Sequence, residues 1–344
     1  MSYQIHPIHK SDIPDIRKLY QEVYPDDPHL VKDTTELEWL FTDPHQKNSM
    51  LGFIARSLEN EPAGVIGFSL NQYQIEGKKV KGVIPVSWMV SPSHRGLLGI
   101  QLLKKVMNEG DFGFAIQGST VAQQAYRAVR MKYIDAAHVY TKVLRPLAYI
   151  RSGTSLSPKA GVKAVVKAGY LLGRRRAAPG RPVVRLEPGS GSQGIHHTPV
   201  AHLAMIPDAK RTSWLGACPL VKMLSFTLYH KDQEKGPAIC YISETKGIRR
   251  GRIVHLPYMG KETEAYRQAI ALLEKELIAH SCCSVNALAM QSASRQALIK
   301  QGYKTYKTAA RSFYVRDPGG LLEGVDLREW YFTFYESDKG YRGI

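Results

Sequence analysis

The chain has 344 residues, of which 44% are apolar and 22% are charged, and its formal net charge is +17. This length exceeds one ordinary domain and predicts two domains of about 150 residues each. The composition excludes an intrinsically disordered protein. The sequence has no run of about 18 apolar residues and no apolar leader behind a basic start, so we expect a cytoplasmic protein without a membrane span.

The four cysteines all lie in the second half, at Cys218, Cys240, Cys282 and Cys283. None of them forms a CxxC pair, and none has the spacing of a metal ligand. We therefore expect reduced cysteines that pack in the interior, and no metal site.

The first 148 residues carry alternating strand and helix patterns. The order is an antiparallel meander followed by a strand-helix-strand unit, which predicts an α/β domain with a mixed (α+β) sheet. The expected elements are a strand at 3–8, a helix from Ile13 with Ile16, Leu19, Tyr20 and Val23 on its apolar face, a helix at 35–41, strands at 50–57, 62–70 and 80–90, a helix at 97–109, a strand at 112–116, a helix at 119–129 and a strand at 132–144.

Residues 149–195 lose this periodicity and are rich in Gly, Pro, Ser, Lys and Arg, so we expect a basic linker. Within the overlapping range 142–186 there are eleven Lys or Arg residues and no Asp or Glu. Such a strip suits an anionic membrane surface. Nucleic acid is less favoured because few aromatic residues are interleaved. A solvated linker without a partner is the alternative.

The second half repeats the order of the first. The stretch "AMQSASRQALIKQGYKTY" resembles "AIQGSTVAQQAYRAVRMKY", which indicates duplication and predicts domains at 1–148 and 196–344 around the linker at 149–195. The elements expected in the second half are a strand at 200–206, a helix at 210–229, strands at 237–244 and 251–257, a helix at 262–280, a strand at 284–290, a helix at 294–301 and a strand at 303–315.

The stretch "SWMVSPSHRGLLGIQLLKKV", residues 87–106, joins a predicted strand to a predicted helix through a glycine-containing turn. A helix N-terminus presents unpaired backbone N–H groups and the positive end of the helix dipole, which together suit a phosphate. Gly96 and Gly99 would let a ligand approach the backbone, and Arg95 could add a charge-assisted hydrogen bond. An ordinary turn with a basic residue is the alternative.

The meander, the basic glycine turn and the tyrosine-bearing helix after it resemble the GNAT superfamily of N-acetyltransferases over about residues 3–145. In that family an Arg/Gln-x-x-Gly-x-Gly/Ala loop wraps the pyrophosphate of acetyl-coenzyme A. Starting that pattern at Arg95 places Leu98 and Ile100 where the family has small residues, which predicts an obstructed or shifted loop. The resemblance implies that acetyl-coenzyme A, or another acyl-coenzyme A, is bound by Val90, His94, Arg95, Gly96, Leu97, Leu98, Gly99 and Ile100.

The following helix contains "AYRAVRM", which is similar to the family's A-Y-x-x-x-G-F stretch except that Arg130 replaces the glycine. The resemblance implies that Tyr126 protonates the departing coenzyme A thiolate after direct attack by an amine. The second half has Leu298 at the tyrosine position and acidic residues after its strand "RIVHLP". We therefore expect two tandem GNAT-like domains, of which the second is degenerate.

The favoured function is an N-acyltransferase that moves an acetyl or other acyl group to a small-molecule or polymer-linked amine. One alternative is a non-catalytic GNAT-like protein that binds an anionic partner through its basic segment. Another is an aminoacyl or long-chain acyl transferase. The strand before the glycine turn carries no carboxylate, so no general base is identified, and Trp39 and Trp88 are either core or groove residues. The sequence does not indicate an oligomeric state.

Overall fold

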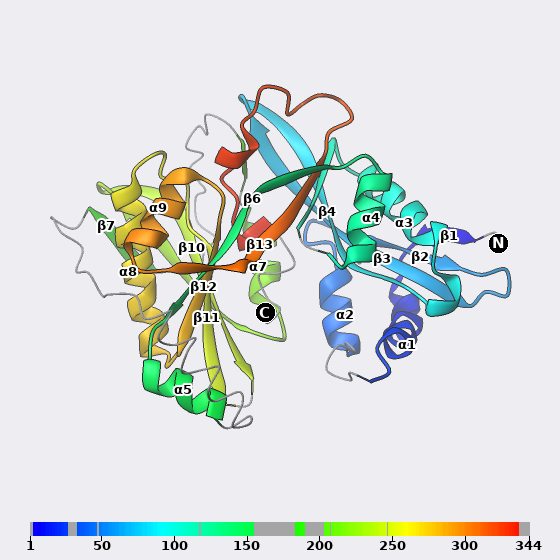
Figure 1. Cartoon of the computed structure of the whole chain (residues 1–344), viewed down its shortest axis with the longest axis horizontal. Helices are drawn as coiled ribbons and strands as arrows, with labels where there is room; N and C mark the ends of the chain where they lie inside the picture. The colour runs from blue at the N-terminus through cyan, green and yellow to red at the C-terminus, as the bar shows by residue number, and fades with distance from the viewer. Residues whose placement is uncertain are drawn as a thin grey trace. The chain divides into compact units, whose positions relative to one another are not determined.

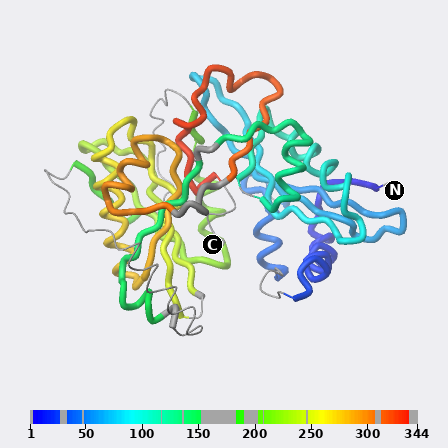
Figure 2. Tube along the Cα trace, viewed as in Figure 1, coloured from blue at the N-terminus to red at the C-terminus, as the bar shows by residue number. Residues whose placement is uncertain are grey.

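The computed structural model, traced in Figure 2, describes residues 3–26, 33–46, 48–116, 118–154, 183–189, 203–206, 208–245 and 247–336. The chain divides into two compact units. The first unit comprises Met1–Ile134, Ala217–Pro219 and Ser312–Val325, and the second comprises Asp135–Gly216, Leu220–Arg311 and Asp326–Ile344.

The first unit is a mixed sheet in the order β1-β2-β3-β4-β5 followed by the end of β13. Among the strand pairs that the structure describes in this unit, β4 and β5 are parallel and the others are antiparallel. Its elements are β1 (Gln4–Pro7), α1 (Ile13–Val23), α2 (Thr34–Phe41), β2 (Gly52–Arg56), β3 (Pro62–Ile75), β4 (Lys78–Val90), α3 (Leu97–Met107), β5 (Phe112–Ile116), α4 (Thr120–Ala128) and the last residues of β13 (Lys304–Arg316).

Helices cover both faces of this sheet, as Figure 1 shows. Side chains alternate along a strand, so neighbouring residues of β2 serve different faces. Phe53 and Ala55 pack with α3 and α4, whereas Ile54 packs with α1 and α2. The predicted apolar face of α1 is confirmed, because Ile13, Ile16, Leu19 and Tyr20 are buried.

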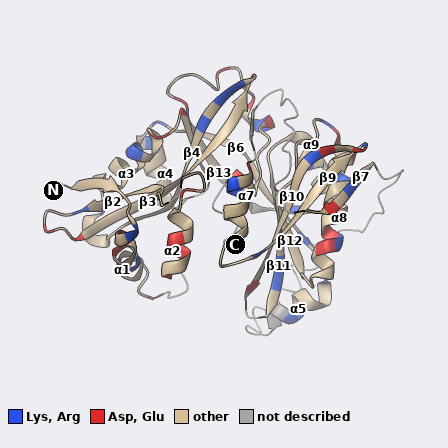
Figure 3. Ribbon diagram, turned by 180° about the vertical axis from the view of Figure 1, so that it is seen from behind, with Lys and Arg blue, Asp and Glu red and all other residues tan. Residues whose placement is uncertain are grey.

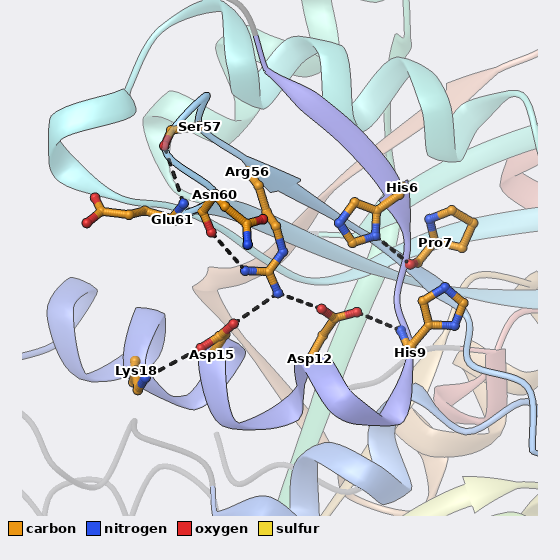
Figure 4. Close-up of polar contacts among 10 residues, drawn as sticks. All are labelled: His6, Pro7, His9, Asp12, Asp15, Lys18, Arg56, Ser57, Asn60 and Glu61. Carbon is orange, nitrogen blue, oxygen red and sulfur yellow. Dashed lines mark hydrogen bonds and ion pairs between the residues drawn. The ribbon is translucent and has the colours of Figure 1, made fainter.

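A polar network fastens the start of α1 to the end of β2 (Figure 4). Arg56 donates to Asp12 at 2.6 Å, lies 2.9 Å from an Asp15 carboxylate oxygen, and donates to the Asn60 carbonyl at 3.2 Å. Burial raises the pKa of Asp12, but the His9 backbone N–H and Arg56 outweigh it and hold that pKa below its usual value. The Arg56 guanidinium is therefore paired with groups of the protein itself, and the network stabilises the fold.

The second unit holds a sheet in the order β6-β12-β11-β10-β9-β7. Within it β11 and β12 are parallel, and β12 and β6 are antiparallel. Its elements are β6 (Lys132–Val143), α5 (Pro146–Thr154), β7 (Val184–Pro188), β8 (Leu203–Met205), α7 (Ala209–Gly216), β9 (Lys222–His230), β10 (Gln233–Thr245), β11 (Ile248–His255), α8 (Thr263–Ala279), β12 (Ser284–Ala289), α9 (Ser292–Lys300) and the first part of β13.

The two halves of the sequence exchange their last strands. β6 ends the first half, yet its residues 138–143 pair with β12 of the second unit. β13 ends the second half, yet its residues 313–316 pair with β5 of the first unit. The predicted domain boundaries at 148 and 196 do not include this exchange of strands. The division into domains at 1–148 and 196–344 stays a prediction.

A buried ion pair holds the exchanged strand β6 in the second unit. Lys142 is 2% exposed and donates to both carboxylate oxygens of Glu274 on α8, at 2.9 and 2.8 Å, and to the Gln301 carbonyl at 2.8 Å. The Gln301 side-chain amide donates to Glu274 at 3.0 Å. We expected Lys142 to belong to the exposed basic strip. That expectation is wrong, because the Lys142 side chain is buried and its charge is paired with Glu274 inside the second unit.

Two further expectations for the second half are wrong. The helix expected at 210–229 is α7, which ends at Gly216, followed by the strand β9. Pro219 lacks the backbone N–H that a continuing helix needs, and the residues after Leu220 alternate as a strand does. Part of the expected linker is β7, which pairs with β9 from Val184↔His230 to Pro188↔Phe226. Residues 155–182 and 190–195 of that linker lie outside the described residues.

The ion pair predicts a large effect of removing one partner. Lys142→Met leaves the Glu274 carboxylate buried without its cation, and unfolding by urea should become easier by about 3–5 kcal/mol. The double variant Lys142→Met/Glu274→Leu should recover most of that loss. Lys231→Met removes a surface partner of Glu262, where the lysine is 61% exposed, and should cost less than about 1 kcal/mol. Equal losses in both single variants would contradict a structural role for the buried pair.

Candidate functional site

The parallel strands β4 and β5 pair over a short stretch and then separate. Among the described residues, their pairing is limited to Gly82↔Phe112 and Val83↔Gly113. β4 continues to Val90, while β5 continues to Ile116 and pairs with β13 along its other edge. In α/β folds, ligands bind outside the carboxyl ends of strands at such points, where backbone groups are not consumed by the sheet.

β4 carries a bulge just beyond this separation. Its pairing with β3 shifts between Val65 and Gly67, so that Ser87 and Trp88 face a single residue, Ile66. Ser87 has a positive φ of 48°, which is uncommon for a residue with a side chain. Bulges bend a strand and redirect its side chains, and this one redirects the indole of Trp88.

The predicted strand-turn-helix junction is present. After β4, Ser91 leads into a 3₁₀ turn at Pro92–His94, and α3 begins at Leu97. Gly96 is the residue before the helix, with φ 126° and ψ −126°, a conformation available to glycine alone. The N–H groups in the first turn of an α-helix have no intrahelical acceptor. In α3 no side chain caps them either. The structure thus supplies the backbone donors that a phosphate would use.

The residues expected to obstruct this turn do not do so. Leu98 is 1% exposed and packs in the core under α3, whereas Leu97 is 74% exposed. Gly99 faces Trp88, since a Cβ built on Gly99 would lie 3.2 Å from the indole Cζ2. Ile100 is half-buried against the same core. The expected obstruction by Leu98 is therefore wrong, because its side chain points into the unit rather than toward the turn.

The remaining residues of the predicted turn differ in exposure. Arg95 is exposed, and Val90 is half-buried. His94 is half-buried, and its Nδ1 lies 3.3 Å from the Tyr3 hydroxyl, with the two rings edge to face at 5.6 Å. Arg95 is therefore accessible to an anion from solvent, while His94 is held against the N-terminal strand region.

Tyr126 lies on α4, close to the bulge of β4. The Ser119 hydroxyl caps that helix by accepting from the Ala122 N–H. Tyr126 is 5% exposed, and its ring centroid lies 6.1 Å from that of Trp88 and 5.1 Å from that of Tyr314. The structure therefore places Tyr126 beside the bulged part of β4.

Two further polar residues hold this end of the unit, and sequence reasoning missed both. Gln123 donates to the Gly118 carbonyl at 3.1 Å and accepts from the Tyr314 hydroxyl at 3.3 Å. Gly118 lies at the hydroxyl edge of the Tyr126 ring, because a Cβ there would be 3.1 Å from both the phenol oxygen and the ring carbon Cε2. Tyr314 belongs to β13, almost 190 residues away in the chain, so no local pattern could have indicated it.

The second unit has the same separation of parallel strands. Pairing of β11 with β12 ends at Ile253↔Ala287. Aligning "AIQ" with "AMQ" at the ends of β5 and β12 places this position opposite Val83↔Gly113 of the first unit. The duplication expected from the sequence is therefore visible in where the two sheets open.

In the second unit this opening is filled by the chain itself. The C-terminal segment, residues 330–336, packs against the end of β11, where the Tyr331 hydroxyl donates to the Leu256 carbonyl. The Tyr335 and His255 rings lie 5.0 Å apart, and Tyr331 and Phe332 line a cavity of about 30 Å³ beside Leu298. A cavity of this size has room for water and not for a coenzyme.

Burial keeps two titratable groups of this filled opening, His255 and Glu336, uncharged at pH 7. Desolvation lowers the pKa of His255 to about 3. Desolvation also raises the pKa of Glu336 to about 8, although the Thr333 backbone N–H and hydroxyl, which hydrogen-bond to its carboxylate, act in the opposite direction. Two arginines also contact the docked segment: Arg211 donates to the Tyr335 carbonyl at 2.8 Å, and the Arg252 guanidinium lies 4.9 Å from the centre of the Phe334 ring.

The described residues show no group of three or more His, Cys, Asp or Glu side chains that could hold a metal ion. None of the four buried cysteines forms a disulfide. No helix in the described ranges is long and apolar enough to cross a membrane. Lys and Arg are spread over several helices and strands of the described chain in Figure 3, and most of the strip at 142–186 lies outside it.

No protein-family model matches the sequence, and no curated protein does. Solved structures do match. A GCN5-related N-acetyltransferase from Anabaena variabilis has a TM-score of 0.56 at 11% identity, covering 92% of this chain and 72% of that chain. Saccharomyces cerevisiae N-myristoyltransferase with bound myristoyl-CoA has a TM-score of 0.54 at 12% identity, covering 92% and 83%. A probable N-acyltransferase from Enterococcus faecalis has a TM-score of 0.53 at 12% identity, covering 92% and 73%.

The chain has the GNAT fold. The matches span nearly the whole chain, so they include both units and are consistent with two tandem GNAT-like domains. The proteins that share the fold in these matches are acyl- and acetyltransferases. At 11–13% identity, this likeness concerns the fold and leaves the chemistry of this chain to its own residues.

The turn before α3 predicts a strain effect that is independent of packing. Gly96→Ala places a Cβ where nothing lies within 4 Å, yet the residue must keep φ at 126°, so we expect a loss of about 1–3 kcal/mol in urea unfolding. Gly319→Ala is the matched control, because its Cβ would also be nearly free of contacts and its φ is not positive. A neutral Gly96→Ala variant would contradict the turn conformation.

The docked Glu336 predicts a pH dependence of stability. Its pKa is raised from 4.5 to about 8, so the free energy of unfolding should fall as the pH rises through this range. Between pH 6.5 and 8.5 this carboxyl group should contribute a fall of about 2 kcal/mol, against a rise of about 0.4 kcal/mol from His255, whose pKa is lowered from 6.5 on folding. Glu336→Gln should abolish the fall, whereas Glu323→Gln, at an exposed acid, should retain it. An unchanged slope in Glu336→Gln would contradict a neutral, docked carboxyl group.

Proposed function

We propose that the protein is an N-acyltransferase whose first unit binds an acyl-coenzyme A, acetyl-coenzyme A in the simplest case, and transfers the acyl group to an amine. The observation that carries this proposal is the separation of β4 from β5 next to both an uncapped helix N-terminus and a tyrosine. The amine belongs to a small molecule or to a polymer. The GNAT fold supports the general chemistry.

The turn would hold the pyrophosphate of the donor. The first N–H groups of α3 are free of caps, and the helix dipole places about half a positive charge there. Arg95 is exposed beside them and can form a bidentate bond to a phosphate. Gly96 provides the backbone conformation that brings these donors together. The donor supplies a thioester carbonyl as electrophile and a thiolate as leaving group.

Tyr126 would supply the proton for the leaving sulfur. The amine nitrogen forms a bond to the carbonyl carbon, the carbon–sulfur bond then breaks with its electron pair on sulfur, and the Tyr126 hydroxyl gives its proton to that sulfur. The proton released by the amine passes to water, since β4 carries no carboxylate, and the Tyr126 phenolate regains a proton from water before the next turnover. The close packing of Tyr126 on Trp88 and Tyr314 fixes the direction of its hydroxyl.

The second unit supports a scaffold role in this proposal. The C-terminal segment fills the position that corresponds to the donor site, and Leu298, which stands where the first unit has Tyr126, is buried and has no proton to give. A non-catalytic GNAT-like protein and an aminoacyl or long-chain acyl transferase are the competing functions. Failure to bind any coenzyme A thioester would favour the former.

Donor binding is tested by thermal shift. Acetyl-coenzyme A at about 100 times its dissociation constant should stabilise the fold by about 2.7 kcal/mol. Arg95→Ala should weaken the shift, because it removes a charged contact at the turn. Lys300→Ala, which removes an exposed cation of the second unit, should leave it unchanged. No shift at millimolar acetyl-coenzyme A would overturn the catalytic proposal.

The role of Tyr126 is tested by turnover with an amine identified by screening. Tyr126→Phe should lower kcat by about 10²–10⁴ while keeping the affinity for the donor. Tyr133→Phe is the matched control, because Tyr133 contacts the far side of Tyr314 at 5.5 Å but is 56% exposed. Unchanged kcat in Tyr126→Phe would show that another group protonates the sulfur.

A further inference from the structure

The indole nitrogen of Trp88 is the most informative polar atom outside the roles assigned above. It is buried, and among the described residues it has no hydrogen-bond partner. A buried N–H without an acceptor is costly, and in native structures such groups are rare. An indole N–H donates and cannot accept, so the missing partner is an acceptor.

The indole is held in one orientation by its neighbours. Gly99, in the first turn of α3, offers no side chain, and a Cβ there would lie 3.2 Å from Cζ2 and 3.7 Å from Cε2 of the indole. Cε2 is bonded to the indole nitrogen, so the N–H lies close to the first turn of α3. The Tyr126 ring lies on another side, at 6.1 Å between centroids. The ring is therefore fixed between the helix that would bind the donor's phosphates and the tyrosine that would protonate its sulfur.

Trp88 also lies in the part of β4 that no longer pairs with β5. The pairing ends at Val83, and the bulge at Ser87 and Trp88 follows. Without the bulge, side chains along β4 would keep strict alternation between the two faces. The bulge thus sets the face on which the indole lies, and this is the face that α3 and α4 cover.

We propose that the Trp88 indole N–H donates a hydrogen bond to the thioester carbonyl oxygen of the acyl donor. The proposal rests on the proposed function. The carbonyl oxygen and the sulfur are attached to the same carbon atom, so a donor for the oxygen must lie beside the proton source for the sulfur. Trp88 and Tyr126 are neighbours of this kind, and the uncapped turn of α3 adjoins them.

The hydrogen bond from the Trp88 indole to the carbonyl oxygen would strengthen as the reaction proceeds. When the amine nitrogen bonds to the carbonyl carbon, the π electrons move onto oxygen, and the N–H faces a full negative charge. The carbonyl then forms again as the carbon–sulfur bond breaks and sulfur takes the proton of Tyr126. The indole keeps its proton throughout, so it stabilises charge without titrating.

The test compares acetyl-coenzyme A with S-ethyl-coenzyme A, which has the same size and lacks the carbonyl oxygen. The intact protein should bind acetyl-coenzyme A about fivefold to tenfold more tightly in calorimetry. In Trp88→Phe the preference should disappear, because the aromatic packing remains and the N–H is lost. Trp39→Phe, on α2, should keep the preference.

Infrared spectroscopy with the acetyl carbonyl labelled by carbon-13 gives a second measurement. The carbonyl stretch should move to lower frequency on binding to the intact protein and to Trp39→Phe, and it should stay at the solution value in Trp88→Phe. A merely structural tryptophan would lower affinity for both ligands alike and leave the stretch shifted, which would overturn the inference. Tight binding of both coenzymes without preference would also overturn the role of Trp88, but it would still support a coenzyme A site in the first unit. Binding of neither would overturn the proposed function with it.

Discussion

The separation of β4 from β5 is the constraint on which the rest of the first unit depends. Two parallel strands that stop pairing leave backbone groups and one layer of side chains without a sheet partner. The unit meets this with a bulge on β4, a glycine turn into α3 and a tyrosine from α4. Trp88, Arg95, Gly96 and Tyr126 all lie within these elements.

The exchanged strand β13 supports this opening from its far edge. It pairs with β5, so it keeps that strand in the sheet after β4 has left it. It also brings Tyr314, which packs on Tyr126 and bonds to Gln123. The sheet of the first unit therefore relies on the last strand of the second half of the sequence. The buried Lys142–Glu274 pair secures the reciprocal strand β6 in the second unit.

The two units share the separation of two parallel strands and differ in the residues that surround it. Both sheets open at an equivalent pair of positions, and in the described part of the chain the C-terminal segment 330–336 packs at the opening of the second unit. Burial leaves His255 and Glu336 uncharged there, and the two arginines that contact the docked segment, Arg211 and Arg252, are themselves buried. A coenzyme with several phosphates requires the opposite, namely exposed cations and free backbone donors, which the turn at Arg95 and Gly96 offers.

Sequence periodicity predicted most elements because amphipathic patterns are local. The strand at 112–116 matches β5, and the helix expected at 262–280 matches α8 within a residue at each end. The prediction of one helix at 210–229 was wrong. An apolar run that contains Gly216 and Pro219 was interpreted as one helix, although a helix ends and a strand begins within it. The obstruction attributed to Leu98 failed for another reason, since spacing alone does not say which way a side chain points.

The site was predicted in part, for a physical reason. The turn and Tyr126 lie in short contiguous motifs, so the sequence could indicate them. The bulge at Trp88 depends on register with β3, and Tyr314 depends on the strand exchange, so both arise from contacts between distant residues. Such contacts leave no local pattern.

Hydrogen exchange of the full chain, with and without acetyl-coenzyme A, is the most direct test of where the donor binds. Binding should slow exchange of the backbone amides at 87–100 and 118–126 and leave those at 253–262 and 287–298 unchanged. Protection confined to the second unit, or no protection in the first, would contradict a donor site at the separation of β4 from β5.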